Sequence, residues 1–152
     1  MIAVLAVLAA LVLGIAQSVQ DRGARSRAEA EIAAIAVACE SYRVDNGIYP
    51  QTANTDTLDP NVDFDASQSR YQNASADLYS ALTGTAASTT TQYFQFKPNM
   101  LNLTAGPAII DPYENYYGYS TAHRNNPTLD LWSTADEQVT TVNEQIKWIK
   151  NW

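Results

Sequence analysis

The chain has 152 residues and a formal net charge of −7, from 9 Lys and Arg against 16 Asp and Glu. Neutralising nucleic-acid phosphates requires clustered basic residues, so this acidic balance argues against a nucleic-acid partner. The single cysteine cannot form an internal disulfide, and the length suits one domain with one core. We therefore expect one globular unit and no nucleic-acid partner.

The chain begins with sixteen residues, Met1 to Ala16, that carry no charged or polar side chain. A helix needs about 20 such residues to cross a bilayer, so the run is slightly short for a span. No basic region precedes it, which argues against a signal peptide. Burying apolar side chains of this kind is worth about 1.5–3 kcal/mol each, so the segment should lie in lipid or against copies of itself.

Helical periodicity continues after the apolar run. Apolar residues recur at spacings of three and four, the signature of a helix with one buried stripe, at Ala28, Ile32, Ile35, Cys39 and Tyr42. Cys39 is on this stripe and is therefore expected to be a core residue, not a reactive thiol. The helix should end at 45–47, where Gly47 can adopt the left-handed capping conformation and Pro50 blocks continuation.

The remainder predicts a small head with an antiparallel sheet. We expect a connecting loop over 51–75 and a short helix that begins at Ser75 and is terminated by Gly84. The expected strands are 93–96, 107–110, 116–120 and 128–133, and the tail 139–152 should be a strand or a short helix. The fold class is therefore α+β, with a long N-terminal α-helix packed against a three- to four-stranded antiparallel β-sheet.

Motifs for catalysis are missing from the sequence. His123 is the only histidine, and no Cys–His or His–carboxylate arrangement surrounds it. There is also no glycine-rich phosphate loop and no defensible pair of carboxylates. We expect no enzymatic activity.

Two other groups of residues suggest surface roles. Tyrosines cluster at Tyr113, Tyr116, Tyr117 and Tyr119, and such a cluster either packs in the core or grips a ligand such as a polysaccharide. A hydroxyl-rich run is a candidate loop for O-glycans, at Ser88, Thr89, Thr90 and Thr91.

Three blocks of the sequence carry a resemblance to a known family. They are the apolar stretch 7–22, Tyr-Arg-Val-Asp-Asn-Gly-Ile-Tyr-Pro at 42–50, and Asp-Pro-Tyr-Glu-Asn-Tyr-Tyr-Gly-Tyr at 111–119 followed by Leu-Asp-Leu-Trp-Ser at 129–133 and the final Asn-Trp. Taken together, they resemble the type IV pilin and type II secretion pseudopilin superfamily, most closely its major pseudopilin. The first block is similar to the latter part of the family's N-terminal methylation helix, the second to the block that ends that helix, and the third to the family's later pieces.

The resemblance implies a structural subunit that polymerises into a helical extracellular or periplasmic filament. Residues 1–27 would be the exposed apolar polymerisation or membrane helix, and residues 28–152 the pilin head. Before assembly, the subunit would reside in the bacterial inner membrane. Its partners would be copies of itself and pilus or secretion assembly machinery. The implied polymerisation core is Val4, Leu5, Val7, Leu8, Leu11, Val12, Leu13, Gly14 and Ile15.

The sequence departs from the family pattern in two places. Aligned on 7–13, the chain starts about eight residues inside the family's mature N-terminus, and eight further apolar residues would give a run long enough to span a membrane. The family's calcium loop has glycines that are absent here, which leaves Ser133 and Asp136 as the residues that could bind calcium. The alternative function is a membrane-anchored or filament-borne module that recognises a polysaccharide or a surface.

Overall fold

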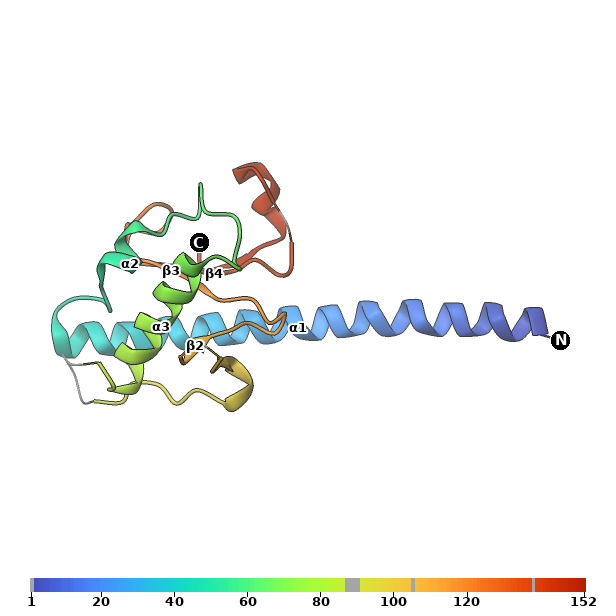
Figure 1. Cartoon of the computed structure of the whole chain (residues 1–152), viewed down its shortest axis with the longest axis horizontal. Coiled ribbons are helices and arrows are strands. Elements are labelled where there is room, and N and C mark those ends of the chain that lie inside the picture. The colour runs from blue at the N-terminus through green and yellow to red at the C-terminus, as the bar shows by residue number, and fades with distance from the viewer. Residues whose placement is uncertain (1, 87–90, 105, 138) are drawn as a thin grey trace.

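The computed structural model describes residues 2–86, 91–104, 106–137 and 139–152, with side chains described from residue 20 onward. Helix α1, Ile2–Asn46, has 45 residues and extends well beyond the head that packs on its C-terminal part (Figure 1). Its predicted end is confirmed, because Gly47 has φ +79° and its N–H donates to the Arg43 carbonyl at 2.8 Å. The same architecture confirms the α+β class.

The predicted loop over 51–75 is wrong in part, because two helices occupy sections of it. Helix α2, Ala53–Thr57, starts with a capping box in which Thr52 and Thr55 each bond the other's backbone N–H. Helix α3, Ser69–Thr83, begins earlier than the predicted Ser75 and ends at Gly84, as predicted, with φ +71°. Its first turns, before Ser75, bury only Tyr71 and Ala74, which is too short an apolar pattern to reveal a helix in the sequence.

The predicted antiparallel sheet is confirmed in part, because three strands form one sheet and two others pair in a separate antiparallel sheet. Strands β1, Leu101–Asn102, and β2, Ala108–Ile109, pair with each other. Strand β4, Asp130–Ser133, lies between β3, Gly118–Ser120, and β5, Ile149–Lys150. The tail contains both predicted alternatives in succession, since the 3₁₀ helix η2, Val142–Lys147, precedes β5.

The predicted strand at 93–96 is absent from this described segment. The backbone N–H groups of Tyr93 and Phe94 both donate to the Leu82 carbonyl, at 2.8 and 3.0 Å, at the end of α3. Their aromatic rings still pack on the core, as the hydrophobic pattern requires. The 3₁₀ helix η1, Pro98–Met100, then leads into β1.

The core lies between α1 and the rest of the head. All five residues of the predicted α1 stripe are buried, including Cys39 at 0% exposure, and they pack with α3 and both sheets. A second cluster centres on Trp132, which stacks on Trp148 at 6.4 Å between ring centroids. Tyr71 of α3 meets Trp132 edge-on and accepts its Nε1–H at 3.0 Å.

We predict that Gly118→Ala destabilises the protein by about 3 kcal/mol, because the new Cβ would lie 2.0 Å from the ring of Trp132. Gly23→Ala is the matched control, since nothing lies within 4 Å of a Cβ there and alanine should stabilise the helix by up to about 1 kcal/mol. Urea denaturation of the two variants measures the difference. Equal stability of the two would contradict this packing of β3 on β4.

Candidate functional site

The predicted polymerisation core, 4–15, lies within α1, but its side chains are outside the described part of the chain. Its role stays a prediction. Where side chains are described, no helix carries a stretch apolar and long enough to cross a membrane.

The junction between the projecting part of α1 and the head is tied by hydrogen bonds to the turn that precedes β3. Tyr113 donates its hydroxyl hydrogen to Asp21 Oδ1 at 2.9 Å, and Tyr117 donates to Glu31 Oε2 at 2.8 Å. Glu31 also pairs with Arg27 at 3.3 Å. These contacts lie along nearly three turns of α1, so they fix the direction in which the helix leaves the head.

The tyrosine cluster is divided between the core and this junction. Tyr117 and Tyr119 are fully buried, and Tyr119 donates to the Pro50 carbonyl at 2.9 Å. Tyr113 and Tyr116 are half-buried. Since burial leaves few faces free for stacking, the four rings do not make an open aromatic platform.

Asp111 organises the turn from which these tyrosines emerge. Its Oδ1 accepts the backbone N–H groups of Tyr113 and Asn115, both at 2.9 Å, and its Oδ2 accepts the hydroxyl of Ser133 at the end of β4. Burial raises the pKa of the Asp111 carboxyl, and the hydrogen bonds from Ser133, Asn115 and Tyr113 oppose that rise. The sequence predicts a turn at Asp111-Pro112, but it gives no signal for the bond between Asp111 and Ser133.

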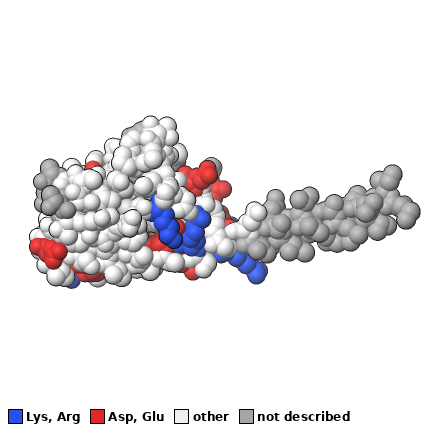
Figure 2. Space-filling view, turned by 90° about the horizontal axis from the view of Figure 1, so that it is seen from below, with Lys and Arg blue, Asp and Glu red and all other residues white. Residues whose placement is uncertain are grey.

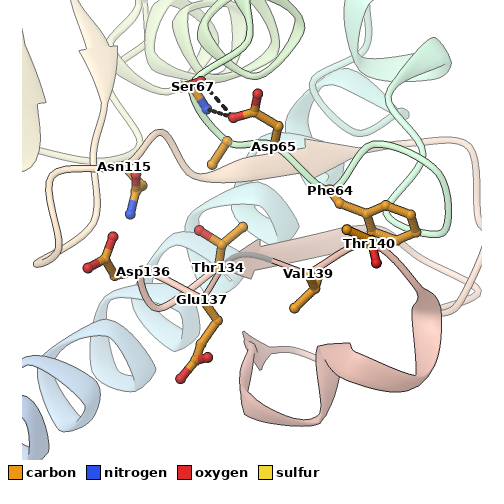
Figure 3. Close-up of a pocket in the computed structure, with 10 residues that line it drawn as sticks. Phe64, Asp65, Ser67, Asn115, Thr134, Asp136, Glu137, Val139 and Thr140 are labelled. Atoms are coloured by element: carbon orange, nitrogen blue, oxygen red, sulfur yellow. Dashed lines mark hydrogen bonds between the residues drawn. The ribbon is translucent and has the colours of Figure 1, made fainter.

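A polar pocket of about 370 Å³ opens beside this turn (Figure 3). It is formed by the segment after α2, the turn before β3 and the loop after β4. Its polar lining includes Asp65, Asn115, Thr134, Asp136, Glu137 and Thr140. Three non-glycine residues at its edges have positive φ, namely Glu114 at +68°, Ala135 at +52° and Asp136 at +57°. Such backbone costs free energy and is often found at functional sites.

The two residues expected to bind calcium are near each other but face different partners. The buried Ser133 hydroxyl bonds Asp111 and accepts the Ala135 N–H at 3.0 Å, whereas the exposed Asp136 lines the pocket opposite Asn115 (Figure 3). Glu137 of the same loop pairs with Lys147 at 3.0 Å. Within the described ranges, no three Asp, Glu, His or Cys side chains converge as a metal site would require.

The proposed O-glycan run lies mostly outside the described residues, which omit Ser88, Thr89 and Thr90. Thr91 is described and is exposed. The role of the run stays a prediction. His123 is exposed in the loop after β3.

In comparisons with known proteins, no family model, no curated protein and no solved structure matches the chain.

We predict that Asp111 makes stability depend on pH. Because its pKa is raised by folding, its contribution is most favourable below about pH 4, the usual pKa of aspartate, and is lost as the pH rises through the raised value. Asp111→Asn keeps the acceptor for the two N–H groups and removes this dependence. Urea denaturation from pH 4 to 8 should show wild-type stability falling relative to the variant, and parallel curves would contradict the prediction.

Asp111→Ala is the matched variant that removes the acceptor itself. It leaves buried donors without partners, so it should lower stability by about 2 kcal/mol or more at every pH.

Calcium binding through Ser133 and Asp136 predicts that a chelator lowers the melting temperature and that Asp136→Asn abolishes this effect. Asp45→Asn is the control, because Asp45 is an exposed carboxylate at the other end of the head. Calorimetric titration with calcium gives the stoichiometry. A melting temperature that the chelator leaves unchanged would contradict calcium binding.

Proposed function

We propose that the protein is a structural subunit with a pilin-like fold that polymerises into a helical filament. The apolar N-terminal parts of α1 would bundle at the filament centre, with the heads outside. The observation that carries the proposal is the division of α1 between two roles. From Ala28 onward one face of the helix is core for the head, while its N-terminal part, which begins with an uncharged apolar run, extends beyond the head (Figure 1).

The junction contacts support the same function. A filament whose helices bundle in one direction requires every subunit to hold its helix at the same angle to the head. The bonds from Tyr113 to Asp21 and from Tyr117 to Glu31 oppose bending between the two parts. A flexible membrane anchor would not need them.

Before assembly, the same segment would reside in the bacterial inner membrane, from which pilus or secretion machinery would move it into a periplasmic or cell-surface filament. The transfer needs little change in solvation, because lipid and a bundle of apolar helices are similar environments. The three blocks that resemble pilins and pseudopilins favour this route.

A second candidate, a filament-borne module for polysaccharide, is favoured only by the polar pocket beside Asn115. Amide, hydroxyl and carboxylate groups of the kind that line it can bond sugar hydroxyls. Binding of assembled full-length protein to a glycan array, lost in Asn115→Ala, would support it.

We predict that a charge in the apolar run prevents polymerisation. Leu11→Asp would put a carboxylate in the bundle centre, where an unpaired charge is costly, so it should reduce the sedimentable fraction at least tenfold. Leu103→Asp is the control, because Leu103 is a 69% exposed head residue. Ultracentrifugation and electron microscopy measure assembly, and fibres from the Leu11 variant equal to wild type would contradict the proposal.

A further inference from the structure

The exposed face of α1 alongside the head carries a continuous stripe without a charged side chain. We call this the outer stripe; its exposed residues on α1 recur at helical spacings and are Ala30, Ala33, Val37, Ser41 and Val44, and the exposed Ile48 follows just after the helix end. Three of them are large apolar side chains, with exposures of 66% for Val37, 78% for Val44 and 56% for Ile48. The buried positions 28, 32, 35 and 39 lie on the opposite side of the helix, so no part of the described head covers the outer stripe.

A second exposed apolar patch lies on η2 and the turn beside it. We call this the apolar tip: Ile146 at 84% exposure, Val62 at 66% and Val142 at 48%. η2 is held on that turn by buried Gln145, whose side-chain amide donates to the Pro60 carbonyl. The tip is therefore a fixed projection of the head.

The two patches lie in different parts of the head. In Figure 1 η2 lies at the edge of the head farthest from α1, with β3 and β4 between them. Within one chain, β3 and β4 separate the apolar tip from the outer stripe, so the two patches cannot contact each other. Contact between them needs two copies, and because the surfaces differ it is a heterologous contact, which produces open helical assemblies when it does not close into a ring.

Charge favours a second copy of the chain as the occupant. Residues 1–27 have a formal charge of +2, whereas residues 28–152 have −9. Arg22 and Arg27 border the N-terminal end of the outer stripe, with Arg27 paired to Glu31, and basic atoms gather where the projecting part of α1 joins the head (Figure 2). At η2 and the loop before it, the three carboxylates of Asp136, Glu137 and Glu144 outnumber Lys147, which pairs with Glu137. This excess of acidic groups at the tip favours its approach to the end of the stripe that lies beside the arginines.

We propose that the apolar tip of one copy docks on the outer stripe of the next, as a head-to-head contact that adds to the bundle of N-terminal helices. The inference rests on the proposed polymerisation but names a separate surface. Thin side chains at Ala30 and Ala33 let the projecting tip approach the helix backbone. Residues on the tip and on the stripe should therefore be neighbours in the assembly and far apart within one chain.

Cysteine cross-linking of the full-length chain tests this contact. Ile146→Cys is combined in turn with Val37→Cys, Val44→Cys or Ile48→Cys, which sample the register along the stripe. Cys39 is buried, so the parent chain is the background control. Under mild oxidation at least one double variant should give a ladder of dimers, trimers and larger species, because each copy uses both surfaces. Mixing the corresponding single variants should stop at dimers.

The matched control replaces Ile146→Cys with Leu103→Cys, at an exposed apolar residue outside both patches, and should give no ladder. Dimers from Ile146→Cys alone, or equal ladders from the control, would overturn the contact. Electron microscopy of the parent chain separates the two proposals. Fibres without any ladder overturn the contact and leave the filament proposal standing. A ladder without fibres overturns the filament proposal and leaves the contact standing. If the chain gives no fibres and no ladder, both proposals are overturned.

Discussion

The head depends on the buried stripe of α1. The strands have only two to four residues each, and sheets of this size are not stable without an apolar surface to cover them. Ile35 and Cys39, both fully buried, provide part of that surface for α3 and the two sheets. Removing the helix would expose one side of the larger hydrophobic cluster, so the head and the C-terminal part of α1 form one folded unit.

This dependence explains why the helix can serve two purposes. Alongside the head, one face of α1 packs in the core and the opposite face is exposed. The N-terminal part of the helix extends beyond the head (Figure 1). The bond from Tyr113 to Asp21 is exposed, and exposed contacts of this kind contribute about 1 kcal/mol or less. The buried Asp111 contributes more, because its donors would otherwise lack a partner. Together these contacts also have a geometric effect, because they hold the turn before β3 against the helix at the point where it leaves the head.

The sequence predicted the parts of the fold that depend on local pattern. The α1 stripe, the caps at Gly47 and Gly84 and the α+β class follow from periodicity and from glycine conformation. It failed where long-range partners decide: Tyr93 and Phe94 look like a strand, but the Leu82 carbonyl takes their hydrogen bonds. At the candidate site, Ser133 ends β4, Asp136 lines the pocket, and calcium binding by the two stays a prediction. The bond from Ser133 to Asp111 could not be predicted, because it joins residues that are 22 positions apart. The patches on η2 and α1 could not be paired from sequence, since only the folded head shows which residues stay uncovered.

Helical reconstruction of fibres assembled from the full-length chain tests the proposed arrangement most directly. We expect the N-terminal parts of α1 on the fibre axis, the heads outside, and η2 of one subunit against α1 of another. Fibres with the heads on the axis, or a full-length chain that stays monomeric under conditions where its apolar segment is released from detergent, would contradict it.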